Sequence, residues 1–122
     1  MIKNLNTKKY DLEQRTYKFA KNVRDFIKDI PKISTNNIYI SQLISSSSSI
    51  GANFIEANEA LSKKDFYHRV RICRKEAKET NFWLLLLDLS SNLALQNKIN
   101  YLLQEVNELM KIFGAIVSKS NY

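Results

Sequence analysis

Residues 62–87 read SKKDFYHRVRICRKEAKETNFWLLLL, and this stretch decides the fold. Ser62 followed three positions later by Asp65 is the pattern of a helix N-cap ahead of an apolar run. Apolar and small residues then recur every three or four positions, which is the spacing of one stripe on an α-helix. The members of this stripe are Phe66, Val70, Cys73, Ala77, Thr80, Leu84 and Leu87. The spacing predicts a helix over residues 63–90.

The last turns of this predicted helix are apolar on every side, from Phe82 to Leu87. A helix that is apolar all round is buried all round. A bundle of 122 residues cannot cover all of these side chains within itself. We therefore expect this end of the helix to contact a second subunit, through Phe82, Trp83, Leu85 and Leu86.

The same helical spacing appears in three further stretches, over residues 11–30, 35–61 and 98–119. Asp11 is the expected N-cap of the first helix, and Pro31 ends it because the residue before a proline is pushed out of the helical region. Four such helices joined by short polar links predict an all-α fold, an antiparallel up-down-up-down four-helix bundle. No repeat or change of composition divides the chain, so residues 1–122 are expected to form a single domain.

The composition excludes several classes of protein. Two glycines and one proline in 122 residues are too few for the turns of an all-β sandwich or barrel. One cysteine excludes a disulfide framework and a cysteine-based zinc site. The longest apolar run is far shorter than a membrane span, and no secretion signal is visible. We expect a soluble, cytoplasmic protein without a membrane partner.

The second predicted helix contains five consecutive serines, Ser45 to Ser49, which favour a helix poorly. One interpretation is a low-complexity loop. The alternative, which we prefer, is a continuous helix, because the spacing of three and four continues in phase through the run. Its outer side has no Lys or Arg and is predicted to contact another subunit through Ser41, Ser45, Ser49, Ala52, Glu56 and Glu59.

The net charge of +7 is concentrated on the first and third predicted helices. The ordinary interpretation is a pair of solvated faces supported by local ion pairs. The functional interpretation is an electrostatic footprint for a polyanion, formed by Lys21, Arg24, Lys28, Arg71, Arg74, Lys75 and Lys78. No zinc-finger, RNA-recognition or homeodomain motif is present, so such binding is expected to have little sequence specificity.

Catalytic and metal-binding patterns are weak in this chain. His68 is the only histidine, and Cys73, five positions later, falls on a different side of a helix. Di-metal bundles need two Glu-x-x-His motifs, which one histidine cannot supply. We expect no enzymatic activity, no metal and no cofactor.

Several of these stretches resemble one family. They are SSIGANFIEANEA at residues 48–60, RICRKEAKE at residues 71–79 and the aromatic-leucine run at 82–87. They are similar to the four-helix-bundle proteins encoded in 23S rRNA intervening sequences, and the resemblance covers roughly residues 10 to 117. It implies a small bacterial protein that assembles into a ring-like homo-oligomer, a homopentamer. It supplies no catalytic residue, and the family's biochemical role is not established.

Two functions therefore remain open from the sequence. The first is non-catalytic association of a basic oligomer with structured RNA, including rRNA, or with DNA. The second is a protein-interaction scaffold. The more distant resemblance to the accessory proteins of diversity-generating retroelements, which partner a reverse transcriptase, is compatible with either.

Overall fold

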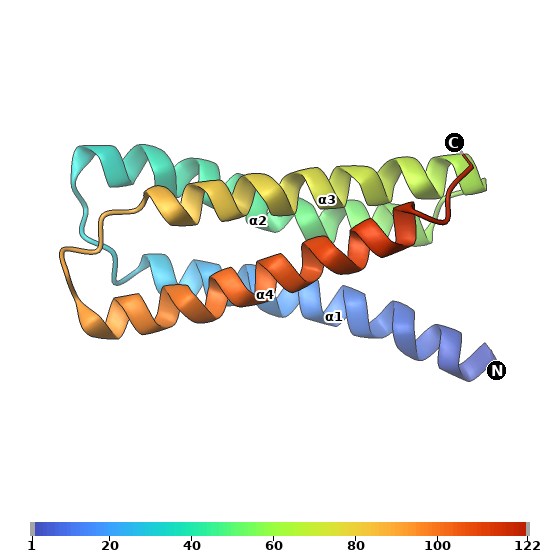
Figure 1. Cartoon of the computed structure of the whole chain (residues 1–122), viewed down its shortest axis with the longest axis horizontal. Coiled ribbons are helices and arrows are strands. Elements are labelled where there is room, and N and C mark those ends of the chain that lie inside the picture. Colours follow the sequence, from blue (N-terminus) through green and yellow to red (C-terminus); the bar gives the residue numbers. More distant parts are fainter. Residues whose placement is uncertain (1, 122) are drawn as a thin grey trace.

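The computed structural model describes the backbone of residues 2–121 and the side chains of residues 12–121. It contains four α-helices: α1 (Ile2–Ile27), α2 (Ser34–Asn58), α3 (Lys63–Leu86) and α4 (Leu93–Val117). Successive helices run in opposite directions, as Figure 1 shows. No strand occurs within the described backbone. The predicted all-α fold of four antiparallel helices is confirmed.

The helices pack in the order of the chain. The contact between α2 and α3 is the most extensive, followed by those of α3 with α4 and α1 with α2, while α1 touches α4 more sparingly. Within the described residues α1 and α3 make no contact, so they lie at diagonally opposite corners of the bundle. The bundle thus has four outer sides, which we call the α1–α2, α2–α3, α3–α4 and α1–α4 faces.

The first helix begins earlier than its sequence pattern predicts, at Ile2 rather than Asp11. No proline or glycine separates these positions, so nothing in the backbone chemistry stops the helix there. The side chain of Asp11 lies outside the described residues. At the other end, the Lys32 ammonium donates to the carbonyl oxygens of Ile27 and Ile30, at 2.6 and 2.9 Å. Ahead of Pro31, these contacts satisfy carbonyl groups that the end of a helix leaves without partners.

The third helix begins as predicted. The Ser62 hydroxyl accepts a hydrogen bond from the backbone N–H of Asp65 at 3.1 Å, which confirms the N-cap. The helix ends at Leu86 rather than near residue 90. The chain then turns through Ser90 and Ser91, whose φ angles of 52° and 57° lie in the left-handed region that a helix cannot use.

The fourth helix also begins earlier than predicted, at Leu93 rather than Lys98. The cause is Asn92, whose side-chain oxygen accepts from the backbone N–H of Leu95 at 3.1 Å. Asn is among the preferred N-cap residues because its short side chain reaches the free donors of the first turn. The sequence pattern had placed Asn92 in the connection between the helices, whereas it is the residue that starts the next one.

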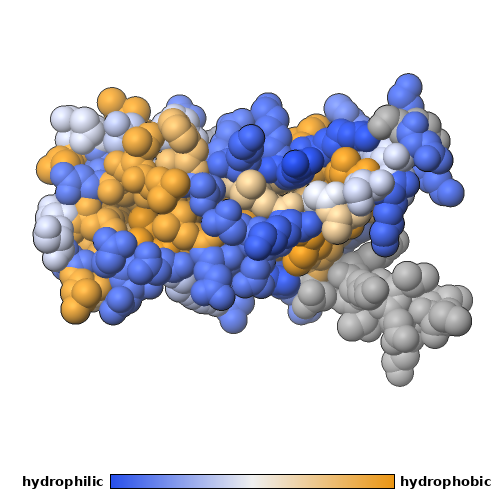
Figure 2. All heavy atoms as spheres, viewed as in Figure 1, coloured by the Kyte–Doolittle hydropathy of each residue, from blue (hydrophilic) through white to orange (hydrophobic). Residues whose placement is uncertain are grey.

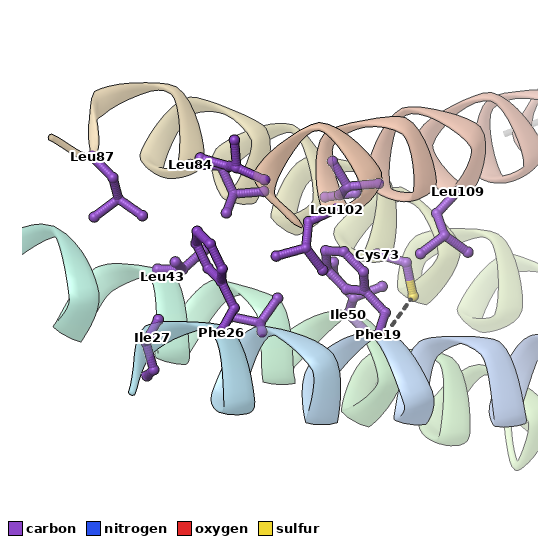
Figure 3. Packing of buried hydrophobic residues seen from close by; sticks show 14 of the residues in the cluster. Phe19, Phe26, Ile27, Leu43, Ile50, Cys73, Leu84, Leu87, Leu102 and Leu109 are labelled. Carbon is purple, nitrogen blue, oxygen red and sulfur yellow. Dashed lines mark hydrogen bonds between the residues drawn. The ribbon is translucent and has the colours of Figure 1, made fainter. Parts of the chain in front are cut away.

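The core follows the predicted stripes of all four helices, as Figure 3 shows for part of it. Fully buried members include Phe19, Leu43, Leu84 and Leu109, one from each helix in turn. The Cys73 thiol also lies in this core and donates to the carbonyl oxygen of Ile50 at 3.4 Å, which joins α3 to α2. No described helix is both long enough and apolar enough to cross a bilayer.

The serine run is continuous helix within α2, so the helical prediction is confirmed and the loop interpretation is wrong. The hydroxyls bond back to carbonyl oxygens of the preceding turn, as Ser48 does to Ile44 at 2.8 Å. This bonding lets serine sit inside a helix without an unsatisfied group. Ser46 and Ser47 are buried, and the Ser46 hydroxyl lies 2.9 Å from that of Thr80 on α3.

The two connections at one end of the bundle are tied together by Asn36, which is fully buried. Its side-chain NH₂ donates to the carbonyl oxygens of Pro31 and Asp88, at 3.0 and 2.8 Å. Its side-chain oxygen accepts from the backbone N–H of Asp88 at 2.9 Å. One amide thus satisfies backbone groups from two loops that are far apart in the sequence.

Candidate nucleic-acid interface

The basic residues predicted on α1, Lys21, Arg24 and Lys28, are all exposed. Lys21 lies over the Tyr17 ring, with its Nζ 5.4 Å from the ring centroid. Arg24 and Lys28 both contact Oδ1 of Asp25, at 3.3 and 3.4 Å. Desolvation works against the charged form of Asp25, but the hydrogen bonds and charges of Arg24 and Lys28 outweigh it and lower the pKa of that carboxyl. Two of these three cations therefore have an acidic partner on their own helix.

A groove of about 470 Å³ lies between α1 and α4 next to this basic group. Its polar lining includes Asp25, Asp29 and Lys98, and the Lys98 Nζ lies 3.4 Å from Oδ2 of Asp29. Two carboxylates against one ammonium make this groove unfavourable for an anion. The groove between α1 and α4 is therefore not a phosphate-binding site.

Two of the basic residues predicted on α3, Arg71 and Arg74, lie toward α4. Arg71 donates from Nη2 to the Ser120 hydroxyl, just beyond the end of α4, at 3.1 Å. The Nε of Arg74 lies next to Gly114 of α4, 3.9 Å from where a Cβ on that glycine would stand. Both side chains therefore lie on the α3–α4 face, and Lys78, one turn after Arg74, shares it.

Lys75 is exposed, four positions after Arg71 and three before Lys78, so helix periodicity places it beside them on the outer side of α3. It is next to Glu76 and four positions before Glu79, and its charge acts against the rise in the pKa of Glu76. Burial, and after it the charge of Glu79, raise that pKa above its ordinary value. Glu76 is on the side of α3 that packs on α2, because Cys73 and Thr80, three before and four after it, both contact α2.

The seven predicted basic residues therefore do not come together within one chain. Three lie on α1 and four on α3, and these helices occupy opposite corners of the bundle. Lys21 and Arg24 line a hollow toward Ser47 and Ser48 of α2, whereas Arg71 and Arg74 lie toward α4. A continuous basic surface that includes both groups needs more than one copy of the chain.

The predicted contact side of α2 is exposed along its length. Ser41, Ser45, Ala52, Glu56 and Glu59 are exposed, and Ser49 is half-buried. The same helix also exposes three isoleucines that the sequence pattern did not assign to a contact, namely Ile38, Ile44 and Ile55. Ile44 lines a hollow with Tyr17, Lys21 and Arg24 of α1, and it stays 46% exposed.

The apolar end of α3 separates into buried and exposed residues. Leu84 and Leu87 face the core, while Phe82, Leu85 and Leu86 are 55%, 64% and 40% exposed. Trp83 is half-buried and packs against Tyr39 of α2, with ring centroids 6.1 Å apart. Of the four predicted contact residues, Trp83 is thus the one largely used within the chain.

Figure 2 shows apolar side chains gathered at this end of the α3–α4 face; further along, hydrophilic side chains predominate, with smaller apolar patches between them. Leu93 at the start of α4 adds to this exposed group, because 75% of its surface is open. Leu93 was not predicted, since the sequence pattern placed it in a loop. We call Phe82, Leu85, Leu86 and Leu93 the apolar end.

His68 and Cys73, the two residues considered for catalysis, do not form a common site. His68 is exposed, whereas Cys73 is fully buried. Burial raises the pKa of the Cys73 thiol to about 12, so the reactive thiolate is scarce at neutral pH. Within the described residues no three His, Cys, Asp or Glu side chains are grouped so as to hold a metal ion.

The fold is similar to that of a known structure. It matches the crystal structure of a protein with unknown function from the S23 ribosomal protein family of Bacteroides thetaiotaomicron, with a TM-score of 0.76 and 27% sequence identity. The match covers 87% of this chain and 97% of that one. No curated protein matches the chain. The model of the 23S rRNA-intervening sequence protein family matches residues 8–115, nearly the whole chain. The protein therefore belongs to the 23S rRNA-intervening sequence protein family.

Proposed function

We propose that this protein is a non-catalytic, self-associating bundle that binds structured RNA through its phosphate backbone, with little sequence preference. The observation that supports it most is the distribution of charge. The chain has a net charge of +7, the excess of Lys and Arg falls on the first and third helices, and no motif that reads bases accompanies it. Backbone binding needs such a surface and nothing more.

Self-association is the second part of the proposal. The apolar end exposes four large apolar side chains at one end of a small bundle, and α2 exposes three isoleucines beside small serines and an alanine. Apolar side chains gathered on the surface, as Figure 2 shows at this end, are typical of a protein–protein contact. A ring-like homo-oligomer, with five copies as the family resemblance implies, would cover these side chains and place several basic groups around one assembly.

No catalytic group is assigned in this proposal. The one thiol is buried with a raised pKa, and the one histidine has no acidic or nucleophilic partner among the described residues. The protein is proposed to act in the cytoplasm, where rRNA is found. The name of its family makes 23S rRNA the first RNA to test.

Salt dependence tests the proposal directly. Fluorescence anisotropy would measure binding of the whole protein to a labelled 23S rRNA fragment, to a scrambled RNA of equal length and to duplex DNA. We expect similar affinities for the first two, and a fall of roughly tenfold or more between about 50 and 200 mM salt, because each neutralised phosphate releases counterions. Affinity that hardly changes with salt, or no binding at low salt, would show that the proposal is wrong.

A protein-interaction scaffold is the second candidate function, and the exposed apolar end is the observation that favours it. In this alternative the ring docks another protein, such as a reverse transcriptase that it serves as an accessory subunit, and the positive charge only keeps the protein soluble. A pull-down from cell extract treated with nuclease separates the two functions. A protein partner that survives the treatment supports the scaffold, whereas recovery that depends on intact RNA supports nucleic-acid binding.

A further inference from the structure

The α3–α4 face has a basic half that extends beyond the residues predicted from the sequence. Its position is defined by three contacts between the helices. Arg71 reaches Ser120, Arg74 lies against Gly114, and the Asn107 side chain of α4 donates to that of Asn81 at 3.1 Å. These contacts show which sides of α3 and α4 meet along this face.

Helix periodicity places two lysines on the same face. Lys78 follows Arg74 by four positions and precedes Asn81 by three, so it lies between them on α3. Lys111 follows Asn107 by four and precedes Gly114 by three, so it occupies the corresponding place on α4. Both lysines are exposed. Nothing in the sequence singled out Lys111, because the fourth helix shows only one clean apolar stripe.

The acidic residues of both helices are turned away from this face. Glu76 lies on the side of α3 that packs on α2, and Asp65 is on that side too, four positions before Arg69, which donates to Asn53 of α2 at 3.1 Å. Glu79, one turn after Glu76, lies next to it on the outer α2–α3 side.

The acids of α4 are turned toward α1. Glu105 and Glu108 both contact the Arg15 guanidinium, at 2.7 and 3.5 Å. No ion pair joins Arg74, Lys78 or Lys111 to a carboxylate within residues 12–121. These three cations of the α3–α4 face therefore have no ion-pair partner among the described residues.

The basic group on α1 is different in this respect. Arg24 and Lys28 share the Asp25 carboxylate, and Asp29 lies one turn further along the same helix. A phosphate approaching this group meets the field of two carboxylates as well as that of three cations. Its attraction is correspondingly weaker, because opposite charges a few ångströms apart cancel at longer range.

The distribution of exposed apolar side chains indicates whether the basic half binds RNA or a second copy of the chain. The centre of a subunit interface is depleted of charged residues and contains large apolar side chains. No large apolar side chain is exposed between Arg71 and Asn81 of α3 or between residues 102 and 118 of α4. The apolar end, where a subunit would dock, begins only at Phe82. The basic half has the composition of a backbone-binding surface.

We propose that the phosphate backbone of the bound nucleic acid lies along the basic half of the α3–α4 face, on Arg71, Arg74, Lys78 and Lys111, and that the α1 group does not contact it. This inference rests on the proposed RNA binding and names its site. From Arg71 to Lys78 the rise along the helix is about 10 Å, at about 1.5 Å per residue. A duplex carries one phosphate per strand about every 3.4 Å of its axis, so a duplex lying parallel to α3 presents roughly three phosphates of one strand over this length.

Two variants with the same change of charge test the inference. The first is Arg74→Gln, Lys78→Gln and Lys111→Gln, which leaves Arg71 and its contact to Ser120 intact. The control is Lys21→Gln, Arg24→Gln and Lys28→Gln on α1. Each removes three exposed cations, so a non-specific effect of net charge is equal in both. Anisotropy with the labelled 23S rRNA fragment measures affinity over a range of salt, and light scattering measures the oligomeric state.

We expect the α3–α4 variant to bind at least tenfold more weakly and to lose about two to three units from the salt slope, as the loss of three phosphate contacts requires. The α1 control should stay within about threefold of the unmodified protein. Equal weakening of both variants would overturn the site and leave RNA binding intact. A change of oligomeric state in the first variant would make the face a subunit interface and would also overturn it. Absence of binding by the unmodified protein would refute the proposed function itself.

Discussion

Gly51 of α2 lies where Thr16 of α1 leaves no room for a methyl group. A Cβ at this position would stand 3.0 Å from the Thr16 hydroxyl oxygen and 3.3 Å from its Cβ. The Thr16 hydroxyl is itself held by the carbonyl oxygen of Leu12 at 2.8 Å. We expect Gly51→Ala to lower the free energy of unfolding by about 1–2 kcal/mol in urea denaturation, because the cost of overpacking exceeds the gain of about 1 kcal/mol in helix propensity.

Gly114→Ala is the matched control for this substitution. Its new Cβ would stand 3.9 Å from Nε of Arg74, which is ordinary contact with a flexible side chain. The same change should therefore raise the free energy of unfolding by about 0.5–1 kcal/mol through helix propensity alone. Effects of the same sign at both glycines would contradict the close approach of α1 and α2.

The Cys73 thiol should make stability depend on pH in the alkaline range. Its pKa is about 12 in the folded protein, raised by burial from an ordinary value of 9.0. Above pH 9 the unfolded chain therefore binds fewer protons than the folded one, so stability falls as the pH rises toward 12. Between these pH values the thiol lowers the free energy of unfolding by up to about 1.4 kcal/mol per pH unit. Below pH 9 the thiol adds no pH dependence.

Denaturation of the protein and of Cys73→Ala at several pH values measures this effect. The variant is less stable throughout because it leaves a cavity, but the difference between the two proteins should shrink between pH 9 and 12. A difference that is constant over this range would mean that the thiol is not buried as described.

The side chain of Asn36 joins the α1–α2 connection to the α3–α4 connection at one end of the bundle. Replacement by alanine would leave part-buried carbonyl and N–H groups of Pro31 and Asp88 without partners, at a cost of about 1–3 kcal/mol. We expect Asn36→Ala to lower the free energy of unfolding by this amount in urea denaturation. The exposed neighbour supplies the control: Asn37→Ala should change it by less than about 0.5 kcal/mol. A small effect at both positions would show that the two loops do not depend on Asn36.

The serine run shows how far local patterns predict an element. The spacing of the flanking apolar residues correctly predicted a continuous helix, although serine favours it poorly. Helix ends were predicted less well. Ser62 is followed by a charged first turn and was recognisable as a cap, whereas Asn92 is followed by an apolar turn and resembled part of a linker. The starts of α1 and α4 were accordingly placed too late.

At the scale of the whole molecule, the apolar end leaves large apolar side chains exposed in a single copy of the chain. Leu85 is 64% exposed in one chain, so Leu85→Glu would cost less than about 0.5 kcal/mol in a monomer. In the proposed oligomer the same change would place a charge in a dry interface, which is costly. We expect Leu85→Glu to reduce the mass measured by light scattering at micromolar concentration, while circular dichroism shows a helix content that is unchanged.

Leu61→Glu is the control, since Leu61 is 98% exposed in the connection between α2 and α3, away from the apolar end. It should leave the mass unaltered. If the unmodified protein is already a monomer at this concentration, self-association through the apolar end is refuted.

The sequence alone determined the helices, the four buried stripes and the family, because each depends on spacing within about four residues or on short motifs. It also located the excess positive charge on two helices. It could not show that these helices lie at opposite corners, since that depends on which stripes pack together. The addition of Lys111 from another helix was likewise decided only by tertiary packing. A helix's own period says which residues share a side, whereas the neighbour that each side meets is set by burial across the whole bundle.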